Sequence, residues 1–155
     1  QNACNGCTAL TDVILKEGIT TIDGYAFYKC SSLTDITVPN SVTDINWYAF
    51  SECSKLANIT LSNNLESIDR YAFTKCVELS EITIPSTLTY IGASAFSGCS
   101  KLNTMTILAT TPPKLAASNS IPSTISTIYI PAGTANAYKA ASNWSSYSSK
   151  FVELS

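Results

Sequence analysis

The stretch Leu33 to Phe50, LTDITVPNSVTDINWYAF, is followed by Cys53 and recurs along the chain without an insertion. A cysteine marks every 23rd residue, at Cys7, Cys30, Cys53, Cys76 and Cys99. An Ala-Phe pair keeps the same period, at Ala26-Phe27, Ala49-Phe50, Ala72-Phe73 and Ala95-Phe96. A fixed period of this size is typical of a solenoid, in which each repeat buries its apolar residues by stacking on its neighbours.

Composition limits the classes of protein that this chain can belong to. The chain has 155 residues, of which 45% are hydrophobic and 13% charged, so a single domain over residues 1–155 with a continuous core is expected. The net charge is −2 and no basic cluster occurs, which argues against nucleic acid as a partner. No apolar run approaches the ~18 residues of a membrane span.

Two apolar registers predict two short strands in each repeat. The first register has the form LxxIxL, as in Leu33-Ile36-Val38, and its last two positions alternate as in a strand with one buried face. The second has the form VxxI, as in Val42-Ile45. The segment that leads to each cysteine suits one or two helical or 3-10 turns that press phenylalanine inward. We expect about five coils over residues 1–107, with a length of roughly 25 Å at ~4.8 Å per coil.

The regular cysteine positions predict a reduced ladder inside the core. Cysteine behaves there as a small apolar residue, and side chains stacked in parallel do not converge as a disulfide requires. The pair Cys4 and Cys7 is the exception: a local bridge between them is possible, although nothing in the sequence requires it.

The repeat pattern loosens after Ile107. Residues 108–133 form an altered repeat in which the second register and the Ala-Phe pair are absent, although Ile128 to Ile130 keep the strand register. Thr134 is predicted to be the N-cap of a helix over residues 135–141, and residues 151–154 to form a last strand. Residues 134–155 are therefore expected to cap the open end of the core.

The repeat resembles the BspA-like leucine-rich repeats, whose unit reads LxxIxIPxxVxxIGxxAFxxCxx. The match is carried by Leu79-Ile82-Ile84-Pro85-Leu88-Ile91-Gly92-Ala95-Phe96-Cys99. The resemblance implies a right-handed leucine-rich-repeat solenoid of the α/β class, a cell-surface or extracellular location, and a role in adhesion or protein binding. The glycine of the unit is present only at Gly92; Asp23, Asn46 and Asp69 replace it, residue types that tolerate a left-handed turn.

The chain offers few groups for catalysis. It has no histidine, so a serine or cysteine nucleophile lacks its usual base and zinc lacks its usual nitrogen ligand. No phosphate-binding glycine loop occurs. We therefore expect no enzyme, no cofactor and no metal site. Asp12 and Asp35 are predicted to meet across coils, either as a weak cation site or as part of a solvated face.

The first set of candidate binding residues occupies the outward position between the last two apolar residues of the first register, as Thr37 does between Ile36 and Val38. It reads Ile14 and then Thr37, Thr60, Thr83, Thr106 and Tyr129. The row forms either a flat strip that meets a protein partner or a solvated face on which threonine is simply a good β-residue.

The position before Ala-Phe gives the second set. It carries Tyr25, Tyr48 and Tyr71, with Trp47 and Tyr28 nearby. Tyrosine and tryptophan dominate interface hot spots and also stack on sugars. The alternative is that each ring covers the coil beside it and shields the turn.

Taken together, these features predict a non-catalytic surface module that binds a host or matrix protein. The alternatives are a carbohydrate-binding module that uses the tyrosine row and a structural spacer of a larger surface protein. The N-terminal coil lacks an obvious cap, so self-association through it is a further expectation. The start at Gln1 suggests a processed or longer parent protein.

Overall fold

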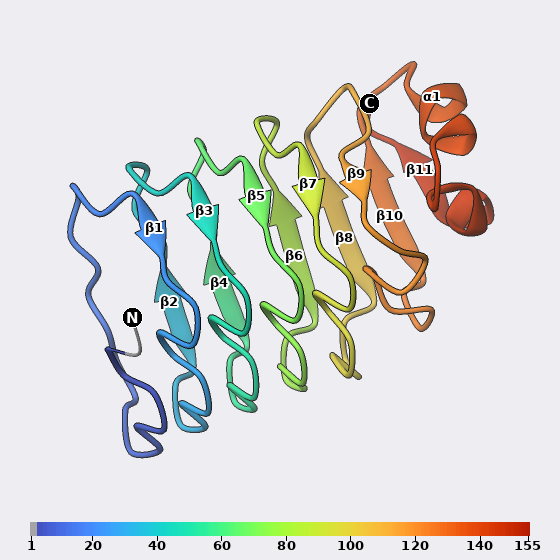
Figure 1. Cartoon of the computed structure of the whole chain (residues 1–155). Helices are drawn as coiled ribbons and strands as arrows, with labels where there is room; N and C mark the ends of the chain where they lie inside the picture. The colour runs from blue at the N-terminus through green and yellow to red at the C-terminus, as the bar shows by residue number, and fades with distance from the viewer. Residues whose placement is uncertain (1–2) are drawn as a thin grey trace.

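The chain forms a solenoid of about six turns, closed at its C-terminal end by a helix and a 3-10 helix (Figure 1). This computed structural model describes residues 3–155. Gln1, from which a processed or longer parent protein was expected, lies outside the described residues. The solenoid confirms the predicted fold class. Its turns, about six in number, compare with the five regular coils and one altered repeat expected from the sequence.

The first register forms one row of parallel strands along the solenoid. Its strands are β2 (Asp35–Thr37), β4 (Asn58–Thr60), β6 (Glu81–Ile84), β8 (Thr104–Ile107) and β10 (Thr127–Ile130), and β11 (Phe151–Glu153) adds to β10 at the end. The row is split into two sheets, of which one holds β2 and β4 and the other holds β6, β8, β10 and β11. The expected strand of the first coil is absent, because the described residues 10–16 form no ladder.

The second register forms a continuous five-stranded parallel sheet. Its strands, in spatial order, are β1 (Thr21–Ile22), β3 (Asp44–Ile45), β5 (Ser67–Ile68), β7 (Tyr90–Ile91) and β9 (Lys114–Leu115). Each strand is only two residues long, and one of the two side chains is buried in every case. The second short strand predicted for each regular coil is therefore confirmed.

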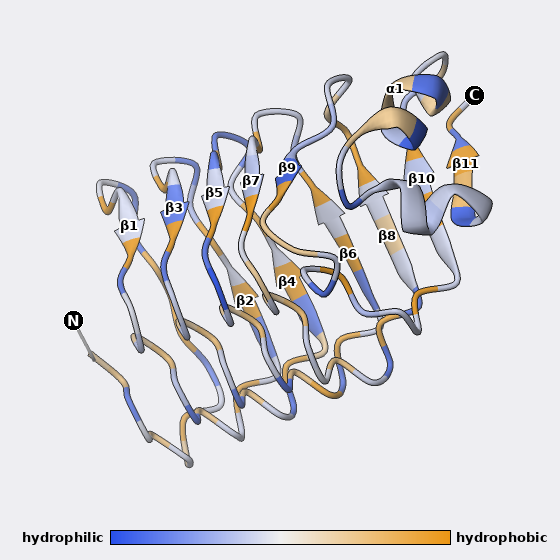
Figure 2. Cartoon of the chain, turned by 45° about the vertical axis from the view of Figure 1, so that its right-hand side comes forward, coloured by the Kyte–Doolittle hydropathy of each residue, from blue (hydrophilic) through white to orange (hydrophobic). Residues whose placement is uncertain are grey.

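The interior consists of equivalent apolar side chains stacked at the repeat period. Hydrophobic and more hydrophilic residues alternate along the longer strands (Figure 2). The phenylalanine rings lie face to face, with centroids 5.2 Å apart for Phe27 and Phe50, 5.3 Å for Phe50 and Phe73, and 5.2 Å for Phe73 and Phe96. Each coil thus covers the apolar residues of the next, as a repeat that has no core of its own requires.

The segment that carries phenylalanine is a series of hydrogen-bonded turns and not a helix. The expected turns are present, each closed by a hydrogen bond from the N–H of residue i+3 to the carbonyl of residue i. They do not continue as a helix, because two residues in each such segment adopt a left-handed backbone. In the second regular coil these are Tyr48, with φ 57°, and Glu52, with φ 62°. A left-handed residue cannot continue a right-handed helix.

Gly92 does not serve as a left-handed turn residue, which corrects the explanation given for the glycine position of the repeat. Its φ lies outside the left-handed range, and the left-handed residue of that coil is Ser94, with φ 56°. A Cβ atom at residue 92 would lie 2.2 Å from the backbone nitrogen of Arg70. Glycine is therefore needed here for close approach between two coils.

The altered repeat keeps a second strand that a search at a strict 23-residue period misses. Strand β9 pairs Lys114 with Tyr90 and Leu115 with Ile91, and both pairs are 24 residues apart. Leu115 is buried and fills the interior position that the regular coils give to isoleucine. One residue is thus inserted before β9, and the register returns to 23 where Thr127 pairs with Thr104.

The C-terminal segment covers the last coil with large aromatic side chains. Tyr138 of helix α1 (Ala135–Ala140) and Tyr147 of the 3-10 helix η1 (Ser145–Lys150) are buried, and so is Trp144, which precedes η1. The Tyr138 hydroxyl donates to the carbonyl of Ala109 at 2.7 Å, and the Trp144 Nε1–H donates to the carbonyl of Pro113 at 2.6 Å. These bonds satisfy the polar atoms of buried rings and fix the segment on the altered repeat.

Thr134 is the residue that precedes helix α1, as expected, but its side chain does not cap the helix. Its hydroxyl donates to the carbonyl of Pro131 at 2.6 Å. The first free N–H of the helix, on Ala135, instead donates to the Glu153 carboxylate at 2.9 Å. The cap therefore comes from the last strand and not from the local sequence.

Candidate functional site

The predicted row of outward residues lies on the first row of strands, but it is not continuous. Thr37 pairs with Thr60 on β2 and β4, and Thr83, Thr106 and Tyr129 lie in register on β6, β8 and β10. The ladder is interrupted between Thr60 and Thr83, because β4 and β6 belong to different sheets. We call these five residues and the surface between them the strip. Thr37, Thr60 and Thr83 are exposed, whereas Thr106 and Tyr129 are half-buried.

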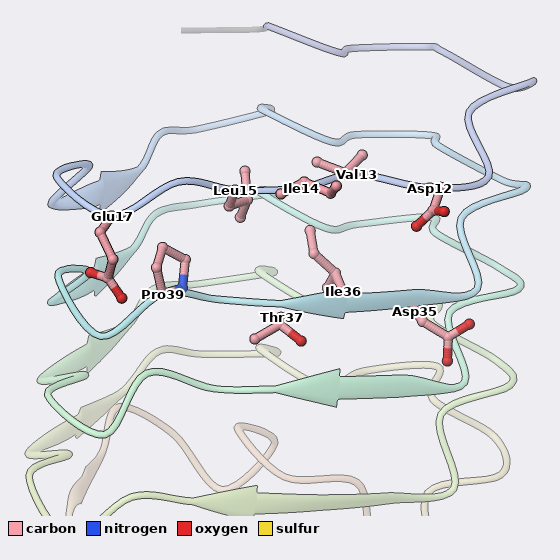
Figure 3. A pocket seen from close by; sticks show the side chains of 9 residues that line it. All are labelled: Asp12, Val13, Ile14, Leu15, Glu17, Asp35, Ile36, Thr37 and Pro39. Atoms are coloured by element: carbon pink, nitrogen blue, oxygen red, sulfur yellow. The ribbon is translucent and has the colours of Figure 1, made fainter.

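A groove lies at the N-terminal end of the strip, between residues 12–17 and β2 (Figure 3). It has a volume of about 420 Å³. Apolar side chains line its middle, and Ile14 is 88% exposed at the position that threonine occupies in the next four coils. An exposed aliphatic side chain of this size beside a strand is open to apolar contact.

Carboxylates lie at both ends of the groove. Asp12 and Asp35 lie at one end and Glu17 at the other, with the apolar side chains between them (Figure 3). Hydrogen bonds from Thr34 and Asn58 lower the pKa of Asp35, so this carboxylate is ionised at neutral pH. The Glu17 carboxylate accepts the backbone N–H groups of Asn40 at 3.1 Å and Ser41 at 3.0 Å.

The predicted tyrosine row is a column of stacked rings. The centroids of Tyr25 and Tyr48 are 5.2 Å apart with 6° between the rings, and those of Tyr48 and Tyr71 are 4.8 Å apart with 15° between them. The ring faces between neighbouring tyrosines are therefore covered by this stacking, and each of the three residues is half-buried. Each tyrosine also has a left-handed backbone, which costs roughly 1–2 kcal/mol for a residue with a side chain.

Trp47 is the more exposed member of this aromatic corner. It is 39% exposed and meets the Tyr25 ring edge-on at 4.8 Å, while the Arg70 guanidinium lies 5.9 Å from its ring centroid. The structure thus brings all four aromatic candidates together, but on the turns beside the five-stranded sheet and away from the strip.

The cysteine ladder is built from thiols that donate to backbone carbonyls. The Sγ atom of Cys53 lies 3.0 Å from the carbonyl oxygen of Phe27, and Cys30, Cys76 and Cys99 repeat this contact one coil apart. Burial raises the pKa of Cys53 to about 12 and that of Cys30 to about 11. These thiols stay protonated and unreactive at neutral pH.

Within residues 3–155, no group of three or more histidine, cysteine, aspartate or glutamate side chains is placed to hold a metal ion. Across the same residues, neither helix has the length and hydrophobicity of a membrane span.

Sequence reasoning missed the groove and the break in the strip. A signal for the groove was present, since Ile14 is an aliphatic residue in a row of threonines. The break had no clear signal, because the repeat period is unchanged between Thr60 and Thr83 and only the hydrogen bonding differs.

The two rows of parallel strands, joined by turns with a 23-residue period, define the leucine-rich-repeat class of solenoids. The BspA type leucine-rich repeat region matches residues 1–113 in six copies. The chain belongs to this family, which confirms the resemblance noted in the sequence.

Solved structures agree with this assignment. A leucine-rich repeat protein of T. pallidum is 34% identical with a TM-score of 0.67, and the match covers 76% of this chain and 56% of that one. A leucine-rich cell surface protein of Faecalibacterium prausnitzii is 30% identical with a TM-score of 0.67, covering 79% of this chain and 33% of that one.

A more distant structure, the pneumococcal vaccine antigen PcpA, shares the fold at 21% identity with a TM-score of 0.63, over 89% of this chain and 38% of that one. The chain thus spans between a third and just over half of the length of these proteins. No curated protein matches the sequence.

Proposed function

We propose that this protein is a non-catalytic module of a surface protein that binds a host or matrix protein through the strip and the groove at its N-terminal end. The family supports this proposal, because a similar protein of known structure is described as a cell surface protein. The groove beside Ile14 is the observation that carries it. An open apolar surface next to a regular strand face is the kind of surface that a protein partner covers.

The charges around the groove suggest which segment of a partner it accepts. Asp12 and Asp35 are both exposed carboxylates beside the apolar residues Ile14 and Ile36. A partner segment with an aliphatic side chain next to lysine or arginine complements both features. Opposite charges steer such a partner and fix its register more than they add affinity.

The aromatic corner supports the carbohydrate alternative less well. A sugar stacks on a free ring face, and the tyrosine column uses ring faces in its own stacking. We assign the column mainly to stability, since stacked aromatic pairs contribute roughly 0.5–1.5 kcal/mol each beyond area burial. That contribution offsets the left-handed backbone of the tyrosines.

Two further expectations remain proposals. A spacer role requires no binding face at all. Self-association requires exposed apolar residues in the first coil, which Ile14 and Ile19 provide at 88% and 37% exposure. Sedimentation of the wild-type chain against Ile14→Thr distinguishes self-association from partner binding, because only self-association changes the mass of the isolated protein.

The test is binding to a panel of immobilised matrix proteins by surface plasmon resonance. Three variants probe the faces: Asp12→Asn/Asp35→Asn/Ile14→Thr for the groove, Thr60→Lys/Thr83→Lys for the strip and Tyr48→Ala/Tyr71→Ala for the aromatic corner. The matched control for added charge is Ser100→Lys/Ser142→Lys, two exposed residues outside the strip. A glycan array with the same proteins tests the carbohydrate alternative.

We expect the groove variant to weaken binding about 3- to 10-fold, since each exposed charge pair contributes roughly 0.2–1 kcal/mol. We expect the strip variant to weaken it as well, and the control to bind as wild type. Loss of binding only in the tyrosine variant, with intact folding, would assign the function to the aromatic corner. Equal binding by all three variants would contradict the proposed faces.

A further inference from the structure

The first turn of the chain differs from its equivalents in the other coils by one residue. In the regular coils this turn reads Ala-Phe-x-x-Cys, and the cysteine N–H donates to the phenylalanine carbonyl, at 3.1 Å for Phe50 and Cys53. The first coil keeps the same bond, from the Cys7 N–H to the Cys4 carbonyl, at 3.1 Å. Cys4 thus occupies the place of the stacked phenylalanine.

This replacement puts two thiols on the same side of one turn. Phe50 and Cys53, at the equivalent positions, are both fully buried, so the first and fourth side chains of the turn both point to the interior. The Cα atoms of residues i and i+3 in such a turn lie less than about 7 Å apart, and a disulfide joins Cα atoms about 4.4–6.8 Å apart. The turn therefore brings Cys4 and Cys7 within bridging range, and the two side chains interact with one another by a hydrogen bond.

We propose that Cys4 and Cys7 form an intramolecular disulfide under oxidising conditions and that this bridge closes the first coil. All six cysteines are free in the structure, so the bridge is a modification of the state described here. It rests on the geometry of the turn and is independent of the proposed binding function. The bridge holds the turn where the column of phenylalanine rings ends at Phe27 and no ring covers it.

The accessibility of the two thiols sets the order of the reaction. Cys7 is exposed, whereas Cys4 is half-buried, and burial together with the neighbouring Cys7 raises the pKa of the Cys4 thiol. With a low-molecular-weight disulfide such as oxidised glutathione, the Cys7 thiolate attacks one sulfur, and the first glutathione thiolate leaves. The Cys4 thiol then loses its proton and attacks the Cys7 sulfur, which releases the second glutathione. Two protein thiols are oxidised and one glutathione disulfide is reduced.

The other thiols do not compete under native conditions. Cys30 is the nearest member of the ladder; it is fully buried, its Sγ lies 3.0 Å from the Cys4 carbonyl oxygen, and burial raises its pKa to about 11. Equivalent side chains in adjacent coils also point in parallel, which suits stacking and not bridging.

The protein comprising residues 1–155 is first reduced, then equilibrated with mixtures of oxidised and reduced glutathione, alkylated in denaturant and digested with trypsin. The first cleavage site follows Lys16, so one peptide, residues 1–16, contains both Cys4 and Cys7. Cys30 lies in a different peptide, after Lys29. We expect residues 1–16 to lose the mass of two hydrogens without gaining alkyl groups, while the other four cysteines remain alkylated.

Two variants sharpen the result. Cys4→Phe restores the residue of the regular coils and removes the resolving thiol, so Cys7 should stop at a glutathione adduct. The melting temperature of the oxidised wild type should fall by about 2–5 °C on reduction. The Cys4→Phe variant, once freed of its glutathione adduct, should have the same melting temperature with and without reductant. Three results would overturn the proposal. They are a glutathione adduct that persists on Cys7 of the wild type, a cross-link between residues 1–16 and the Cys30 peptide, and a wild-type melting temperature that does not change on reduction.

Discussion

The Phe50 and Phe73 rings lie face to face, with centroids 5.3 Å apart and 4° between their planes, although 23 residues separate them in the sequence. Both rings are fully buried. This stack repeats along the chain and forms the centre of the shared interior, so a residue in its middle supports the coils on both sides.

Phe73→Ala is therefore expected to destabilise the protein strongly. The substitution removes ring contacts with Phe50 and Phe96 and leaves a cavity, at a cost of about 3–5 kcal/mol. Guanidinium unfolding followed by circular dichroism measures the change. Tyr71→Phe, which keeps a ring in the outer column, is the control and should change the free energy of unfolding by less than about 1 kcal/mol. Similar costs for the two variants would be inconsistent with the stacked interior.

The cysteine ladder predicts a loss of stability at alkaline pH. An unfolded thiol ionises near pH 9, whereas the folded Cys53 thiol has a pKa of about 12. Between these values the folded state holds a proton that the unfolded state loses, so the free energy of unfolding falls as pH rises from 9 to 12. Each such thiol contributes a slope of about 1.4 kcal/mol per pH unit.

Comparison of the wild type with Cys53→Ala isolates this slope. The variant loses some stability at every pH through its cavity, but its decline above pH 9 should be shallower than that of the wild type. Urea unfolding of both proteins, at intervals of half a pH unit, measures the free energy of unfolding from which the two slopes are obtained. Parallel curves for the two proteins would mean that the Cys53 thiol does not stay protonated in the fold.

Gly92→Ala is expected to destabilise the protein by about 1–3 kcal/mol or more, because the added methyl group meets the backbone of Arg70 and not a side chain that can move. Asn46→Ala is the matched control, since residue 46 is the equivalent position two coils earlier and already carries a side chain. Thermal unfolding compares the two. A Gly92→Ala protein as stable as the control would show that the coils are further apart than described.

Glu153→Ala is expected to cost about 1 kcal/mol by removing the cap of helix α1. Glu66→Ala is the control, as an exposed glutamate on another coil. Guanidinium unfolding of both proteins measures the difference. A loss of stability no larger than that of Glu66→Ala would show that Glu153 does not cap helix α1.

The sequence was sufficient for the repeat, for the two strands of each regular coil after the first and for the buried cysteines from Cys30 to Cys99, because packing positions recur at one period. It was insufficient where long-range contacts decide. The Ala135 N–H bonds to a carboxylate 18 residues away, and strand β9 is shifted by one residue against the repeat. The left-handed tyrosines were also missed, since local propensity disfavours that backbone and only stacking between coils explains it.

The binding residues were named from an outward pattern alone. The structure places the threonines and the tyrosines on separate surfaces and adds the groove beside Ile14. A single sequence shows which residues point outward, but not where coils separate to leave a hollow between them.

Nuclear Overhauser contacts between the phenylalanine rings test the shared interior most directly. In a protein with ring-labelled phenylalanine, each signal is assigned by its loss in a single Phe→Leu variant. The stacked coils predict contacts between Phe27 and Phe50, Phe50 and Phe73, and Phe73 and Phe96, with none between Phe27 and Phe73. If the rings of Phe50 and Phe73 gave no contact while the protein was folded, the successive repeats would not share one core.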